Sequence, residues 1–162
     1  MSTDENIALL FQITAHVSND TLGYKISDFK IEPARVKTIY DPDSQVFNET
    51  FSDMKVTTNI PAERKENFFY TLTLASNEAQ CDLIDGNNWE YKPPKIFIND
   101  DVGDYVQLKL HSGSEFKISN SSLGFKTDNR KIKIRYNEID SDFFYSKVKS
   151  CYGSIKFTIG LL

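Results

Sequence analysis

Apolar and polar residues alternate along the first segment of the chain, residues 6–17. From residue 7 onward every second position is apolar: Ile7, Leu9, Phe11, Ile13, Ala15 and Val17. A period of two places these side chains on one face of a β-strand, and Gln12, Thr14 and His16 on the other. The first clear turn signal follows at residues 19–23. Two hypotheses fit this pattern: an ordinary first strand of a sheet, or a strand that can leave its own domain and complete a neighbouring one.

The last segment of the chain, residues 153–162, alternates as regularly as the first. Its apolar positions share one face of a predicted strand: Ile155, Phe157, Ile159 and Leu161. The polar positions between them share the opposite face. The sequence therefore predicts two well-patterned strands at the two ends of one chain.

Between these ends the sequence predicts a series of short strands separated by turns. Residues 67–74 form the clearest internal strand, and residues 142–148 are expected to form another. Residues 77–88 are rich in turn formers and predict a loop, with a helix over residues 76–83 as the alternative. Strands this short, with turn clusters roughly every 8–12 residues, are typical of an all-β sandwich.

The composition fits one domain of this kind and argues against several classes of partner. The 162 residues suffice for one hydrophobic core, which 12 Phe and 8 Tyr can fill. The net charge is −4 and the lysines and arginines are dispersed, so we expect no nucleic-acid binding. No apolar run has the length of a transmembrane helix, and the first residues lack the pattern of a secretory signal. We therefore expect a cytosolic protein, or a mature form whose signal peptide has been removed.

Few side chains suggest catalysis or cofactor binding, and we expect neither. Cys81 and Cys151 are too far apart for a zinc knuckle or a redox CxxC motif. They would form one disulfide in an oxidising compartment and remain two buried thiols in the cytosol. The two histidines have no triad or metal-ligand spacing.

A motif between residues 33 and 59 resembles a known family. A proline precedes a Val-Lys strand, a Tyr-x-Pro-x-Ser-x-x-Phe segment follows, and a strand ends in Thr-Asn. The matching positions are Val36, Lys37, Tyr40, Pro42, Ser44, Phe47, Val56, Thr58 and Asn59. Together with the closing strand at residues 152–159, this pattern is similar to pilin subunits of the alpha class of chaperone–usher fimbriae, the colonisation-factor-antigen type of enterotoxigenic enterobacteria. The chain departs from the major subunits of that class in its cysteine pair and its more charged and aromatic middle section.

The resemblance implies an incomplete immunoglobulin-like β-sandwich that is completed by donor-strand exchange. Residues 1–19 would be an N-terminal donor-strand extension, and residues 20–162 the pilin domain. In such pilins the C-terminal strand borders a groove where one strand is missing. The apolar face of residues 7–17 would fill the groove of a neighbouring subunit by β-strand addition. The periplasmic route of the family further implies a disulfide between Cys81 and Cys151.

The leading hypothesis is a structural subunit of a bacterial adhesive fimbria, which is not an enzyme and needs no cofactor. Its expected partners are neighbouring pilin subunits, a periplasmic chaperone and an outer-membrane usher, with a host-cell receptor as a further candidate. Its expected location is the fimbrium on the cell surface, reached through the periplasm. The alternative is a receptor- or carbohydrate-binding adhesin with a similar sandwich, in which Trp89 beside Tyr91 could line a sugar site. A cytosolic β-sandwich enzyme is the third hypothesis, for which the sequence offers no nucleophile, metal or phosphate motif.

Overall fold

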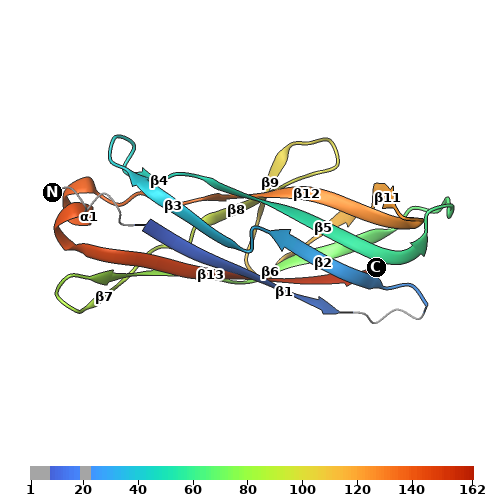
Figure 1. Cartoon of the computed structure of the whole chain (residues 1–162), viewed down its shortest axis with the longest axis horizontal. Helices are drawn as coiled ribbons and strands as arrows, with labels where there is room; N and C mark the ends of the chain where they lie inside the picture. The colour runs from blue at the N-terminus through green and yellow to red at the C-terminus, as the bar shows by residue number, and fades with distance from the viewer. Residues whose placement is uncertain (1–7, 19–22) are drawn as a thin grey trace.

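Two β-sheets packed face to face make up most of the molecule (Figure 1). The computed structural model describes residues 8–18 and 23–162. Its strands are β1 (Ala8–Ser18), β2 (Ile26–Glu32), β3 (Arg35–Asp41), β4 (Val46–Phe47), β5 (Thr50–Pro61), β6 (Phe69–Leu83), β7 (Asn88–Glu90), β8 (Lys95–Asn99), β9 (Tyr105–Leu108), β10 (Gly113–Lys117), β11 (Asn120–Ser122), β12 (Phe125–Arg135) and β13 (Val148–Leu161). One helix, α1 (Ser141–Lys147), occurs in the described part of the chain. The expected all-β sandwich is confirmed.

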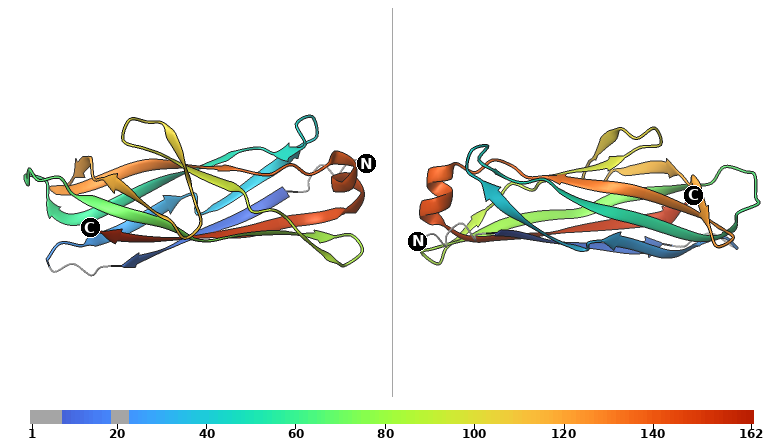
Figure 2. Two further views of the ribbon diagram at one scale, coloured as in Figure 1. Left: turned by 180° about the vertical axis from the view of Figure 1, so that it is seen from behind. Right: turned by 45° about the horizontal axis from the view of Figure 1, so that its top comes forward.

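The order of strands places the first and last strands of the described chain side by side. The first sheet has seven strands in the order β10-β6-β13-β1-β3-β4, with β7 paired to β6. The second sheet has six strands in the order β2-β5-β12-β8-β9, with β11 paired to β12. Both views in Figure 2 show the strands running along the long axis, with α1 at one end and the C-terminus toward the other. The first and last strands, β1 and β13, are therefore neighbours in one sheet.

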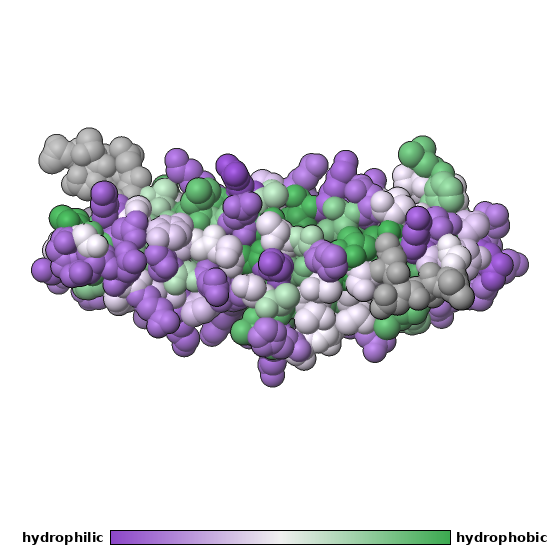
Figure 3. Space-filling view, turned by 90° about the horizontal axis from the view of Figure 1, so that it is seen from below, coloured by the Kyte–Doolittle hydropathy of each residue, from purple (hydrophilic) through white to green (hydrophobic). Residues whose placement is uncertain are grey.

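Alternating side chains from both sheets fill the space between them. In β12, Ile132 and Ile134 are buried, while Lys131, Lys133 and Arg135 occupy the outward positions between and beside them. On the face seen from below (Figure 3), hydrophobic side chains form small separate patches among hydrophilic ones. The period-two pattern of the sequence thus concentrates the large apolar side chains in the interior.

A buried ion pair lies within this core. The Arg130 guanidinium, 6% exposed, donates from Nε to Asp128 Oδ2 at 2.7 Å. The Tyr70 hydroxyl donates to the same oxygen at 2.6 Å, and burial raises the pKa of Tyr70 above its usual range. Arg130 also donates from Nη2 to Asp101 Oδ1 at 2.5 Å. Because each charge has several partners, the pair can remain buried, and it links β6, β12 and the β8–β9 turn.

The alternative helix over residues 76–83 is wrong, and the loop predicted over residues 77–88 is confined to residues 84–87. The strand β6 continues through this region to Leu83. It does so because β13 pairs with it along one edge, while β7 pairs with residues 80–82 on the other. These non-local partners satisfy the backbone, so tertiary pairing outweighs the local preference of turn-forming side chains.

The strand predicted over residues 142–148 is also wrong, because most of this segment forms α1. Asp140 is the N-cap, and its Oδ2 accepts a hydrogen bond from the Phe143 backbone N–H at 3.1 Å. Phe144 is buried and stacks on Tyr40, with ring centroids 3.8 Å apart. A cap and one buried aromatic anchor therefore stabilise a helix of two turns. No helix in the described part of the chain is long and apolar enough to cross a membrane.

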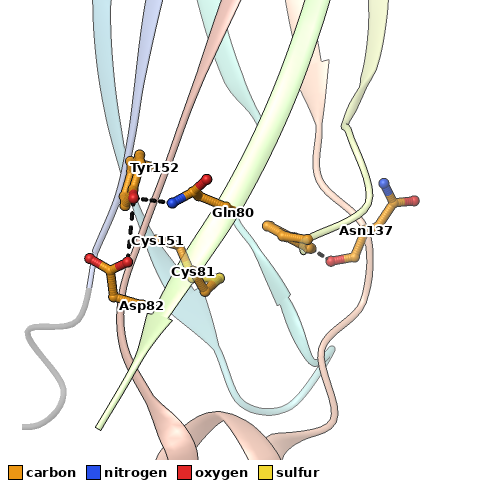
Figure 4. Close-up of a disulfide and its surroundings, with 7 residues drawn as sticks. Gln80, Cys81, Asp82, Asn137, Cys151 and Tyr152 are labelled. Carbon is orange, nitrogen blue, oxygen red and sulfur yellow. Dashed lines mark hydrogen bonds between the residues drawn. A yellow bond between two sulfur atoms is a disulfide. The ribbon is translucent and has the colours of Figure 1, made fainter. Parts of the chain in front are cut away.

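A disulfide joins Cys81 and Cys151, as the resemblance implies. The two residues lie directly opposite one another in β6 and β13, and both are buried (Figure 4). They are separated by 70 residues in sequence. Closing a loop of this length stabilises a fold by about 4 kcal/mol in the chain-entropy model. The bond therefore links β13 covalently to β6 in the first sheet.

Candidate functional site

The N-terminal strand β1 fills the gap between β13 and β3 of its own chain (Figure 1). It pairs in parallel with β13, from Leu9 opposite Cys151 to Ser18 opposite Gly160. It pairs antiparallel with β3 along its first part only, ending at Gln12 opposite Arg35. Without β1, the first sheet would separate between β13 and β3. The central connection of this sheet is thus made by β1.

The apolar face of β1 enters the core over the first half of the strand. Leu9, Phe11 and Ile13 are buried there, and Val17 is partly buried against the core. Ala15 is exposed, which differs from the expected continuous buried face. The residue Ile7, also predicted to belong to this face, lies outside the described residues.

The second half of β1 is less covered because β3 no longer lies beside it. Beyond Gln12, the Ile13 N–H donates to the Ala34 carbonyl at 2.8 Å, and the ladder between β1 and β3 has ended. A hollow of about 350 Å³ then opens between β1 and β2, lined in part by Ala15 and Phe29. The exposure of Ala15 follows from this opening.

Phe11 makes the closest fit in the site. It lies directly opposite Gly153 in β13, and a Cβ atom added at Gly153 would stand 2.5 Å from the Phe11 ring. The same ring lies against Tyr136 of the core, with centroids 5.5 Å apart. The sequence did not predict Gly153 as a site residue. A glycine inside a well-alternating strand is the signal that could have indicated it, because such a glycine often marks the close approach of another group.

The four residues that the resemblance implies as a groove wall lie on β13, the strand that pairs with β1. Ile155, Phe157 and Ile159 are buried on β13, and Leu161 is partly buried. The opposite wall, β3, was not predicted. Its inward side chains, Val36, Thr38 and Tyr40, are buried. Which strand forms this wall depends on the order of strands in the sheet, and the pattern of apolar and polar residues does not determine that order.

The inward face of β1 carries no charged side chain in the described residues, and the site is built for an extended strand. Its contacts are backbone pairing on both edges and apolar side chains below. Burial raises the pKa of Tyr136 above its usual range, so this neighbour of Phe11 stays neutral, and its hydroxyl lies 2.8 Å from Thr50 Oγ1. Within the described residues, no group of three metal-ligating side chains converges on one point. The arrangement is suited to holding a strand by hydrogen bonds and burial.

Other candidates from the sequence lie elsewhere. His16 is exposed on the outer face of β1. Trp89 is half-buried and stacks on Tyr91, with centroids 5.7 Å apart. Comparison of the chain with models of protein families and with curated proteins found no match. The geometry of β1 and its groove is therefore the basis for assigning a function.

Proposed function

We propose that the chain is a structural subunit of a bacterial adhesive fimbria, and that it polymerises by inserting β1 into the groove of a neighbouring subunit. The observation that supports this most directly is the place of β1 between β13 and β3, at the terminus of the chain. The family resemblance implies a groove beside the C-terminal strand that an N-terminal strand fills. The described structure has an N-terminal strand beside the C-terminal strand, with its apolar side chains in the core.

In this proposal the described molecule is the closed form, in which β1 occupies its own groove. Loss of β1 would leave two unpaired strand edges and an apolar slot, which a free monomer does not tolerate. Burial of Leu9, Phe11 and Ile13 contributes about 1.5–3 kcal/mol each, as an upper estimate. A neighbour's groove can bury the same apolar side chains. During assembly a periplasmic chaperone that lends a strand would keep the groove available, and in its absence a high protein concentration would favour exchange.

The direction of β1 makes the closed and exchanged forms distinguishable. Both β1 and β13 run from the α1 end of the molecule toward the end near the C-terminus (Figure 1). When subunits stack in one orientation along the long axis, a strand from a neighbour must approach the groove from the α1 end. It would then run antiparallel to β13. The period of two keeps the same apolar side chains facing inward in either direction.

Head-to-tail insertion does not close on itself, so it produces a fibre. The proposed partners are neighbouring pilin subunits, with a periplasmic chaperone and an outer-membrane usher during assembly. The proposed location is the fimbrium on the cell surface. The disulfide between Cys81 and Cys151 agrees with passage through an oxidising compartment.

The test is uptake of a free strand. A chain that lacks residues 1–18 should bind a labelled synthetic peptide of residues 6–18 and become more stable to urea. A peptide with Phe11→Asp should bind far more weakly, because the charge would enter the core, whereas Thr14→Asp should bind normally because Thr14 is exposed.

A second measurement uses the full chain. Concentrated full-length protein should form SDS-resistant ladders on unboiled gels, and the truncated chain should not. Polymerisation by the truncated chain, or equal binding of both charged peptides, would contradict the proposal.

A further inference from the structure

The outer face of the first sheet carries an ordered row of side chains that strand exchange does not use. Strand pairing sets five residues directly beside one another across β3, β1, β13, β6 and β7. In that order they are Lys37, Leu10, Tyr152, Gln80 and Glu90. None of the five is buried, because they alternate with the core-facing positions of their strands. The row therefore runs from a cation, through an apolar centre, to an anion.

The two neighbouring rows on this face have a similar order of charge. One of them crosses β3, β1, β13 and β6 through Arg35, Gln12, Ser154 and Glu78. The row on the other side reaches β6 at Asp82. None of these charged side chains takes part in an ion pair within the described residues. The outer face is thus positive along β3 and negative along β6 and β7.

Large apolar side chains remain exposed at the centre of this face. Leu10 is 47% exposed and Tyr152 is 40% exposed, and they lie directly opposite one another in β1 and β13. The Tyr152 hydroxyl accepts a hydrogen bond from Gln80 Nε2 and donates to Asp82 Oδ1 at 3.3 Å, which restrains the ring (Figure 4). Ile39 on β3 adds a third apolar side chain and is 56% exposed. A ring that is fixed before a partner arrives offers apolar contact at a low entropic cost.

We propose that this face binds a second copy of the chain, with the two first sheets packed outer face to outer face around a two-fold axis parallel to the strands. Such an axis places the β3 side of one sheet against the β6 side of the other. Arg35 and Lys37 of each copy then face the carboxylates of the other copy. Leu10 packs on Tyr152 of the partner subunit. The surface is therefore complementary to itself in both charge and apolar contact.

The charge pattern selects this axis over the other one that would bring the same faces together. A two-fold axis across the strands would set Arg35 and Lys37 of the two copies against one another, and like charges repel. With the axis along the strands, both copies point in the same direction. Twisted sheets of the same hand pack face to face with their strands about 30° apart, as in β-sandwiches.

The size of the patterned face predicts a weak association. Five strands about 4.8 Å apart and three rows about 6.8 Å apart span about 24 by 20 Å, so a pair of copies buries about 1,000 Å² in total. An interface of about this area is at the lower limit for specific association. Lys156 occupies the following outward position of β13 and ends the pattern. We therefore expect dimers at protein concentrations on the order of 100 μM and above.

Sedimentation velocity on the full chain tests the proposal. The chain should be monomeric at about 10 μM and contain dimers at about 500 μM, and about 1 M NaCl should dissociate them because it screens exposed charges. The double variant Arg35→Glu with Lys37→Glu should stay monomeric throughout. Lys30→Glu with Lys55→Glu is the matched control, because these two lysines are also exposed and lie opposite one another on the second sheet. The control makes the same change in net charge and should dimerise as the wild type does.

A charge swap tests the direction of the two copies. Adding Glu78→Lys and Glu90→Lys to the Arg35→Glu, Lys37→Glu variant restores the wild-type net charge and inverts the pattern, so dimers should return. A wild type that stays monomeric at about 500 μM, equal dimerisation of the two double variants, or a monomeric charge-swap variant would overturn the proposal. These dimers should dissociate in SDS, whereas strand-exchanged ladders should persist in every variant. The failure of one proposal is therefore distinguishable from the failure of the other.

Discussion

Replacing Phe11 by alanine should destabilise the closed monomer more than any other single truncation in β1. The Phe11 side chain is fully buried, and its ring occupies the space that a side chain at position 153 would otherwise need. Gly153 cannot fill the resulting cavity, and Tyr136 is held 2.8 Å from Thr50 Oγ1 by its hydroxyl. The site can collapse only slightly, so we expect a loss near the middle of the range for Phe→Ala, about 4 kcal/mol.

Urea denaturation followed by tryptophan fluorescence measures this loss. With a slope of about 2 kcal/mol/M, the midpoint should fall by about 2 M. Gln12→Ala is the matched control, because Gln12 is the next residue on the same strand and is exposed, so its effect should stay within about 0.5 kcal/mol. Each variant is measured at two protein concentrations, because exchange between molecules would make the midpoint depend on concentration. If Phe11→Ala lowers the free energy of unfolding by less than about 1 kcal/mol, no more than Gln12→Ala does, the burial of β1 in its own sheet is refuted.

Three further predictions follow from the same geometry. The first is a double variant, Leu10→Cys with Lys37→Cys, at two exposed and directly opposite positions of β1 and β3. The resulting disulfide should keep β1 in its own sheet and the protein monomeric on unboiled gels. Ladders from the oxidised variant would argue against exchange of β1. Asp128→Asn removes the buried partner of Arg130 and should cost about 3–5 kcal/mol in urea denaturation, so a loss below about 1 kcal/mol would show that the pair is not buried. Burial raises the pKa of Tyr40 from 10.0 to about 12, so the stability from its neutral form is present below pH 10 and lost between pH 10 and 12. Urea midpoints across this interval should fall less in Tyr40→Phe than in the wild type, because the other buried tyrosines with raised pKa values, Tyr70, Tyr91 and Tyr136, are present in both.

The sequence by itself determined which side chains of the two terminal strands face the interior. Leu9, Phe11 and Ile13 of β1 are buried, as are Ile155 and Phe157 of β13, because a strand of period two has one face for the core. The class of fold also followed from the sequence, since short alternating strands between turns can bury their faces only against one another.

The tertiary structure alone decided the partners of these strands. It placed β1 between β13 and β3, extended β6 through a turn-rich segment, and converted residues 141–147 into a helix. It also exposed Ala15, where β3 no longer lies beside β1, and brought Gly153 under the Phe11 ring. The physical reason is the range of the interactions: the period of a strand is a local property of the backbone. Pairing, coverage and close fit depend on contacts between residues far apart in sequence, and these exist only once the chain has folded.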